Sequence, residues 1–127
     1  MTYYFIWKLD SDRPIYTQLL EQLQKYIVSG KYGPGSKLPS VRELAADAGV
    51  NPNTMQRAFT ELERDGLIIT QRTTGRFVTE DTDRIAAIRS NLAQKLLADF
   101  FAGMKELGYS SPEISSFLKN EQNKWEN

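Results

Sequence analysis

The fold is decided by residues 50–66, "VNPNTMQRAFTELERDG". Four apolar residues in this stretch recur at the i, i+3, i+4 and i+7 spacing of one helix face: Met55, Ala58, Phe59 and Leu62. This spacing predicts an amphipathic helix with one buried face. Asn51 is a typical N-cap and Pro52 suits the first helical position. Gly66 indicates where the helix ends.

Charge is distributed unevenly along this predicted helix. Residues 50–60 contain no carboxylate and a single arginine, Arg57, whereas residues 61–65 contain three carboxylates. Acidic residues normally favour the first turn of a helix, where the macrodipole is positive, so this distribution opposes the usual preference. It suits a helix whose first turn faces phosphate groups, because free N–H groups and the dipole attract anions.

Two further helices are predicted upstream. The first follows Pro14, which suits a first helical position, and carries an apolar residue at every fourth position: Ile15, Leu19, Leu23 and Ile27. The second is predicted at residues 41–48, because Ser40 and Glu43 have the spacing of a capping box. Gly49 closes this helix, and only a tight turn separates it from the helix that begins after Asn51.

The remaining N-terminal segments favour extended structure. The aromatic run "YYFIWKL" at residues 3–9 predicts either a strand or a packed extended arm. Residues 67–70 and 76–79 are two short β-prone runs around "QRTTG", which predicts a hairpin with its tip near residues 73–75. Helix, helix, tight turn, helix and hairpin is the order of a winged helix-turn-helix domain, predicted here at residues 1–80.

The tail, residues 81–127, is predicted to form two helices. The first carries a long apolar stripe: Ile85, Ile88, Leu92, Leu96, Phe100, Met104 and Leu107. Gly108 stops this helix, and the second is expected to start with Ser111 as N-cap and Pro112 as the first helical residue. The stripe can be covered by the final helix of the same chain or, as we favour, by the same helices of a second chain. The residues expected to carry a dimer interface are Ile88, Leu92, Leu96, Phe100 and Met104.

Composition excludes several classes of site. The 127 residues carry 16 basic and 16 acidic side chains, so any attraction to nucleic acid must be local. The absence of cysteine and histidine removes thiolate nucleophiles, zinc sites built on these residues and the usual general base. No run is apolar enough to span a membrane, and the N-terminus lacks the features of a signal peptide. The sequence thus predicts a cytoplasmic protein that is not an enzyme and holds no metal or cofactor.

The outward face of the predicted third helix indicates a nucleic-acid partner. Opposite its apolar side, it projects polar residues of the types that bind base edges and phosphates: Asn53, Gln56, Arg57 and Thr60. The hairpin repeats the pattern, because it contains Arg72 and Arg76 and no acid. Arg42, in the second predicted helix, can add a further contact. The structural alternative for Arg57 is an ion pair with Glu61, four residues further along the same helix.

The segment from residue 14 to residue 78 resembles the DNA-binding domain of GntR-family bacterial transcription regulators. The resemblance rests on four motifs in combination: "PIYTQ", "SGKYGPGSKLPSVRELA", "GVNPNTMQRAF" and "LERDGLI". The short tail is similar to that of the YtrA subfamily, in which a small helical dimerisation region replaces a larger effector domain. The resemblance implies a repressor that binds double-stranded DNA as a homodimer, and that controls an ABC transporter operon. A small-molecule effector remains open.

The resemblance also implies which residues contact DNA. By motif position they are Arg42, Asn51, Asn53, Thr54, Gln56 and Arg57, with the wing tip around Gly75. The chain departs from the family pattern at Pro52 and Gln56, where many relatives carry arginine, and at the wing, "RTTGRF", which lacks a basic "RGKG"-like tip. The alternative to a DNA reader is a winged-helix module that binds another protein, and salt dependence of DNA binding distinguishes the two.

Overall fold

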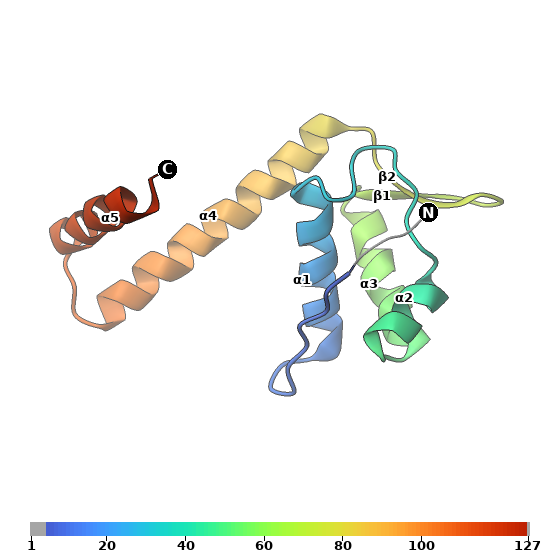
Figure 1. Ribbon diagram of the computed structural model, residues 1–127, viewed down its shortest axis with the longest axis horizontal. Coiled ribbons are helices and arrows are strands. Elements are labelled where there is room, and N and C mark those ends of the chain that lie inside the picture. Colours follow the sequence, from blue (N-terminus) through green and yellow to red (C-terminus); the bar gives the residue numbers. More distant parts are fainter. Residues whose placement is uncertain (1–4, 127) are drawn as a thin grey trace. The chain divides into compact units, whose positions relative to one another are not determined.

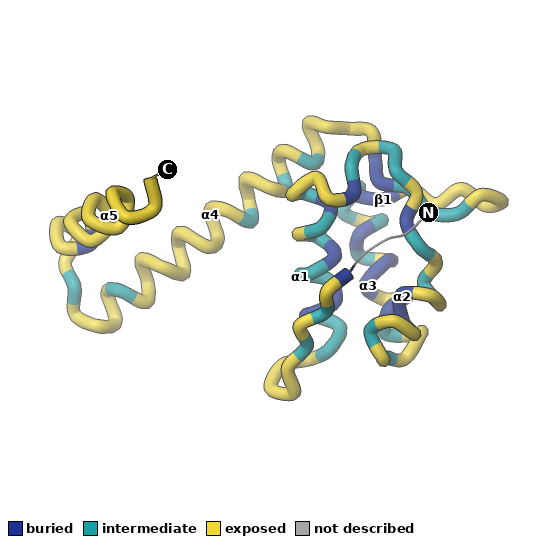
Figure 2. Tube along the Cα trace, viewed as in Figure 1, coloured by how far each residue is buried: buried dark blue, intermediate teal, exposed yellow. Residues whose placement is uncertain are grey.

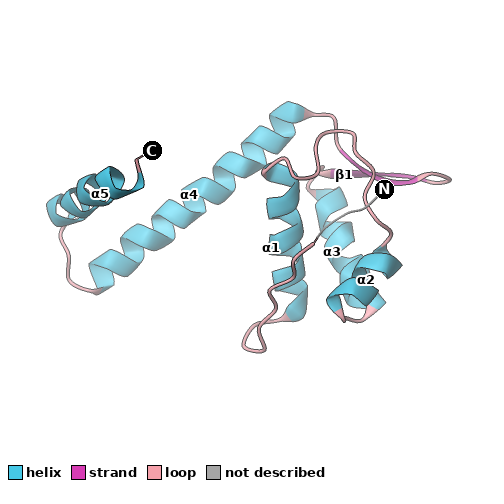
Figure 3. Ribbon diagram, viewed as in Figure 1, coloured by secondary structure: helices cyan, strands magenta, loops and turns pink. Residues whose placement is uncertain are grey.

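The computed structural model describes residues 5–126 (Figure 1). It contains five helices and one two-stranded sheet: α1 (Ile15–Val28), α2 (Val41–Ala48), α3 (Pro52–Arg64), β1 (Ile68–Gln71), β2 (Gly75–Val78), α4 (Thr82–Glu106) and α5 (Ser111–Trp125). The chain forms two compact units that divide between Arg89 and Ser90, within α4. The predicted fold, mainly helical with a small hairpin and a helical tail, is confirmed (Figure 3). Within the described residues, no helix combines the length and the apolar character that crossing a bilayer requires.

The core of the first unit lies around α3, which packs against both α1 and α2. The apolar face predicted for α3 is confirmed, since four of its side chains are fully buried: Met55, Ala58, Phe59 and Leu62. Leu19 and Leu23 of α1 and Leu44 of α2 close this core from the other side. Figure 2 shows buried segments in these three helices and in the hairpin beside them. Because the apolar face of α3 points inward, its polar face is left at the surface.

Local capping signals set the start of α2 and α3. The Ser40 backbone N–H donates to the Glu43 carboxylate at 3.0 Å, and the Glu43 N–H donates to the Ser40 hydroxyl at 3.0 Å. These bonds from Ser40 hold the pKa of the Glu43 carboxyl below its ordinary value. Gly49 ends α2 in the left-handed conformation, at φ 70°. Asn51 then caps α3, because its side-chain oxygen accepts from the Asn53 N–H at 2.7 Å.

The wing differs from the prediction in the position of its turn and in a third segment that pairs with it. β1 and β2 pair antiparallel, with Gln71 opposite Gly75, so the turn covers residues 72–74 instead of 73–75. The connector between α1 and α2 adds a third line of backbone pairing outside β2. The Leu38 N–H donates to the Arg76 carbonyl at 2.8 Å, and the Val78 N–H donates to the Ser36 carbonyl at 2.9 Å. This pairing fixes the connector beside the hairpin.

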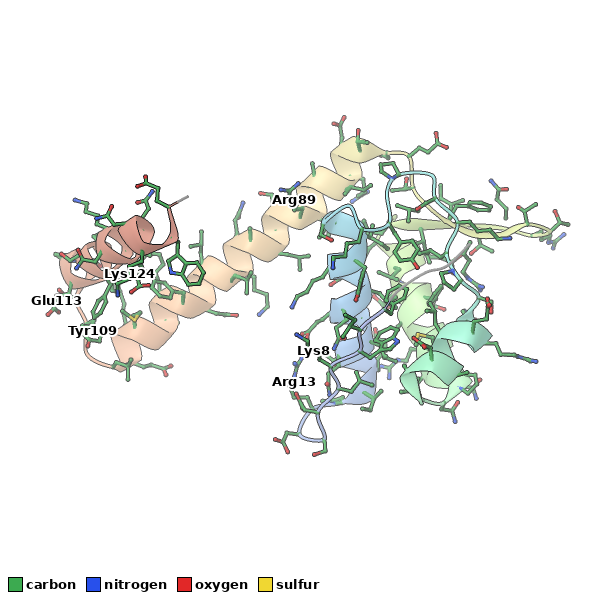
Figure 4. All side chains as sticks on the ribbon, in the orientation of Figure 1. Lys8, Arg13, Arg89, Tyr109, Glu113 and Lys124 are labelled. Carbon is green, nitrogen blue, oxygen red and sulfur yellow. The ribbon has the colours of Figure 1, made fainter. Side chains whose placement is uncertain are left out.

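The N-terminal segment is an extended arm and not a strand. The earlier part of the predicted run, Tyr3 and Tyr4, lies outside the described residues. Glutamine side chains of α1 hold the arm: the Gln22 amide exchanges two hydrogen bonds with the backbone of Lys8, at 3.1 and 2.8 Å. The Gln18 amide does the same with the backbone of Asp10, at 2.8 Å in both directions. Figure 4 shows Lys8 beside α1.

Two features at the starts of the tail helices were not predicted. Ile85 and Ile88, in the first turns of α4, pack against the core of the first unit, so Ile88 contributes there. The N-cap of α5 is Ser110 and not Ser111, since Ser110 forms a capping box with Glu113. A box requires Glu or Gln three residues after the cap, and only Ser110 has one. Ser110 hydrogen bonds accordingly hold the pKa of the Glu113 carboxyl below its ordinary value.

The second unit leaves most of its apolar side chains uncovered (Figure 2). Ile114 is its buried residue, whereas Leu96 is 68% exposed and Trp125 is 78% exposed. A groove of about 490 Å³ lies between α4 and α5, with Tyr109 and Phe117 in edge-to-face contact at 5.0 Å on its wall. Tyr109, Glu113 and Lys124 mark this unit in Figure 4. One copy of the tail therefore does not bury its own apolar stripe.

Candidate nucleic-acid interface

The exposed face of α3 presents the residues predicted to meet DNA. Asn51, Asn53 and Arg57 are exposed, and Thr54 and Gln56 are partly exposed. The first turn of α3 contains no acidic residue, so its N–H groups and the positive end of its dipole face outward without a competing carboxylate. The Asn51 side-chain oxygen is occupied by the cap on α3, and that leaves its amide N–H₂ group to donate to a ligand.

The acids of α3 are held away from this face. Glu61 forms an ion pair with Arg64 at the C-terminal end of the helix. The Glu63 carboxylate accepts a hydrogen bond from the Thr70 hydroxyl of β1. Each of these carboxylates therefore has a partner on the side of α3 away from its first turn. This accounts for part of the asymmetry of the sequence, because Glu61 and Glu63 have partners at the C-terminal end of α3 and the first turn contains no acid.

Arg57 is not paired with Glu61, which was the structural alternative for it. Its guanidinium carbon lies 3.9 Å from the centre of the Tyr16 ring, which comes from the first turn of α1. Stacking on an aromatic ring uses the face of the guanidinium and leaves its N–H groups at the edge. Arg57 therefore keeps its positive charge and its donors for a ligand.

Arg76 takes a different place from the one predicted for a wing residue. It is partly buried, and its Nη2 atom lies 3.5 Å from the Gln56 Oε1 atom of α3. Its guanidinium also lies over the Phe59 ring at 5.5 Å. Its Nε atom is buried and has no hydrogen-bond partner within the described residues. Arg76 thus joins the wing to α3 beside Gln56.

The other predicted cations, Arg72 and Arg42, are exposed on other elements than Arg57 and Arg76. Arg72 is exposed in the hairpin turn, and Arg42 is exposed in the first turn of α2. Gly75 lies under the connector, because a side chain on it would approach the Lys37 Cε atom to 3.1 Å. Lys37 is an exposed cation at the wing that sequence reasoning missed. Its bridge to Phe77 joins segments 40 residues apart, so no local pattern could have indicated it.

Comparison with known proteins agrees with this geometry. Residues 15–78 match the family model described as "Bacterial regulatory proteins, gntR family". The HTH-type transcriptional repressor YtrA of Bacillus subtilis is 38% identical over 117 residues, which cover 86% of this chain and 90% of the repressor.

Two solved structures extend the comparison. A GntR family transcriptional regulator from Listeria monocytogenes superposes with a TM-score of 0.82 and 41% identity, covering 88% of this chain and 98% of that one. The DNA-binding domain of AraR, in complex with operator ORE1, has a TM-score of 0.51 and 32% identity over 59% of this chain and 94% of that domain. The family model covers half of the present chain, and the likeness to YtrA and to the Listeria structure extends through the tail. The chain therefore belongs to the GntR family and is a DNA-binding transcription regulator.

Proposed function

We propose that this regulator contacts the base edges of its operator with the first half of α3. The wing and α2 then contact the phosphate backbone of the flanking DNA. The proposed contacts are Arg42, Asn51, Asn53, Thr54, Gln56, Arg57, Arg72, Gly75 and Arg76. The observation that carries the assignment is the exposed, acid-free start of α3, next to a wing that contains no carboxylate. In helix-turn-helix proteins, the start of the recognition helix meets the base edges.

The proposed functional form is a homodimer joined through the tail. Its support is the apolar stripe on α4, where Leu96 is 68% exposed and Phe100 is 38% exposed, so that α5 leaves them uncovered. The proposed interface residues are Ile88, which also packs against the core of the first unit, and Leu92, Leu96, Phe100 and Met104. A second copy of the same surface would cover the stripe, as is usual for two-fold dimers.

A dimer implies an operator with two-fold symmetry. A single winged helix reaches few base pairs, whereas two copies joined by a tail bind two half-sites with a high effective concentration for the second. We therefore propose an inverted-repeat operator. Repression follows from occupancy of a promoter by such a dimer, and the relative YtrA is a transcriptional repressor by name. We further propose an ABC transporter operon as the target, which rests on resemblance to the YtrA subfamily alone.

Selection from a pool of random-sequence duplexes by the wild-type protein tests the proposal. The recovered duplexes should share an inverted repeat, and binding should weaken steeply as salt rises, because phosphate contacts release counterions. The matched variant carries Leu96→Glu together with Phe100→Glu. It should sediment as a folded monomer and lose its preference for the full repeat over one half-site. A wild type that is monomeric at micromolar concentration, or a double variant that still prefers the full repeat, would contradict the dimer.

A further inference from the structure

The motif "PIYTQ" contains one side chain that the proposed interface does not use, Tyr16. We propose that Tyr16 is a positioning residue for operator recognition: its ring holds the Arg57 guanidinium of α3 in the plane from which Arg57 contacts DNA. The inference rests on the proposed role of Arg57 and adds a residue from α1, a helix to which no contact has been assigned. The 3.9 Å separation between the Arg57 guanidinium carbon and the ring centre carries it.

A free arginine at this position has no fixed orientation. Its side chain is long and flexible, and ordering it on a ligand costs conformational entropy. The natural alternative partner is Glu61, and an ion pair with that acid would neutralise Arg57 and occupy its donors. Glu61 is instead paired with Arg64. Stacking on Tyr16 orders the guanidinium while leaving both its charge and its N–H edge available.

The ring is itself held firmly. Tyr16 is partly buried against the core of the first unit. Two residues later, Gln18 is 1% exposed, and its amide fixes the entry into α1 by donating to the carbonyls of Asp10 and Arg13 at 2.8 and 2.9 Å. The chain therefore enters α1 along a fixed path just before and after Tyr16. A ring on such a path can orient a neighbouring side chain, whereas a ring on a mobile loop could not.

Binding to the selected duplex separates this role from the alternatives. Tyr16→Leu should raise the Kd for that duplex by about three- to tenfold, as expected for a lost cation–π contact that is partly desolvated. The Kd for a scrambled duplex of equal length should stay within about twofold. Tyr16→Phe, which keeps the ring and loses only the hydroxyl, should bind like the wild type. Thermal melting of each variant gives its transition temperature. Binding is then measured below that temperature, so that only folded protein is compared.

A double-variant cycle asks whether the effect passes through Arg57. In an Arg57→Ala background, Tyr16→Leu should have no further effect on Kd. In the free protein, the Arg57 Nε–H proton should resonate upfield because the guanidinium carbon bonded to Nε lies over the Tyr16 ring, and Tyr16→Leu should abolish that shift.

Each other result overturns the inference. Equal losses in Tyr16→Phe and Tyr16→Leu would assign the effect to a hydroxyl contact with DNA. Additive effects of Tyr16→Leu and Arg57→Ala would show that the two residues act independently, and an unshifted Nε–H would show that they do not stack. If selection recovers no shared sequence, the proposed function fails and this inference fails with it; a shared sequence that all Tyr16 variants bind equally overturns the inference alone.

Discussion

Replacing Phe59 with alanine removes the largest side chain that is fully buried in the first unit. A buried Phe→Ala change costs about 3–5 kcal/mol, from lost transfer free energy and the cavity that remains. The Arg76 guanidinium lies 5.5 Å from this ring, and losing a cation–π contact adds about 0.5–1 kcal/mol. We therefore expect a loss of about 3.5–6 kcal/mol in the free energy of unfolding.

That loss is large relative to the stability of so small a unit. The first unit ends at Arg89, and domains of that size are stable by about 5–13 kcal/mol. Phe59→Ala should therefore remove a large share of the stability of the first unit, and DNA binding should fall as the folded fraction falls. Thr60→Ala is the matched control, since Thr60 is the next residue of α3 and is exposed; it should change stability by less than about 0.5 kcal/mol.

Tryptophan fluorescence can follow the first unit alone. Trp7 lies in the arm, where its ring stacks on Phe5 at 5.0 Å and its indole N–H donates to Asp47 at 3.0 Å. The chain has two tryptophans, and Trp125 is in the tail. In a Trp125→Phe background, urea unfolding monitored by emission therefore reports the arm and α2. A loss below about 1 kcal/mol in Phe59→Ala, the typical effect of an arbitrary substitution, would refute the assignment of the inward face of α3, and with it the outward face.

Three further outcomes follow from the same contacts. Arg57→Ala should raise the Kd for the selected duplex by about 5–150-fold, whereas Glu61→Ala should leave it unchanged or slightly lower; equal effects in a gel-shift titration would contradict the division of α3. The folded state lowers the pKa of Glu43, so this group adds stability above the ordinary glutamate pKa of about 4.3 and loses it as pH falls through the lower folded value. The difference in urea midpoint between wild type and Glu43→Gln should therefore shrink on acidification, and a constant difference would contradict the capping box. Gly75→Ala should destabilise the wing by about 1–3 kcal/mol, because Gly75 has φ 116° and a side chain would approach Lys37 to 3.1 Å; an unchanged melting temperature would mean that the turn has another backbone conformation.

The elements that could be predicted from the sequence depend on signals a few residues long. The capping box of Ser40 and Glu43, the Asn51 cap and the left-handed Gly49 are each encoded within four positions. The same logic explains the error at Ser111, because two adjacent serines both suit a cap and only the position of Glu113 decides between them. The buried face of α3 was predictable because its period is short and its four apolar residues are unambiguous.

The parts that could not be predicted depend on contacts between segments far apart in the sequence. Lys37 reaches the wing only because the connector pairs with β2. Arg76 has the sequence neighbours of an ordinary surface residue, and its burial against α3 follows from how the hairpin packs. The stack of Arg57 on Tyr16 joins residues in different helices. The sequence thus indicated which residue types form the interface, whereas tertiary packing determined which of them are free, tethered or stacked.

The N-terminal arm has a consequence for how this sequence can drift in evolution. Its hydrogen bonds to Gln18 and Gln22 use backbone atoms of Lys8 and Asp10, so they are indifferent to the side chains at those positions. The side chains at positions 5, 7 and 9, which alternate with these two, are constrained, since Phe5 is buried and Trp7 and Leu9 are partly buried. Homologues should therefore vary at positions 6 and 8 of the arm and remain apolar at positions 5, 7 and 9, whereas the Asp10 carboxylate also accepts a hydrogen bond from the Asp12 N–H. An alignment of these homologues would show the two-residue period that is typical of a β-strand, although residues 5–10 pair with no strand. The period would come from the hydrogen bonds of two glutamines in a helix.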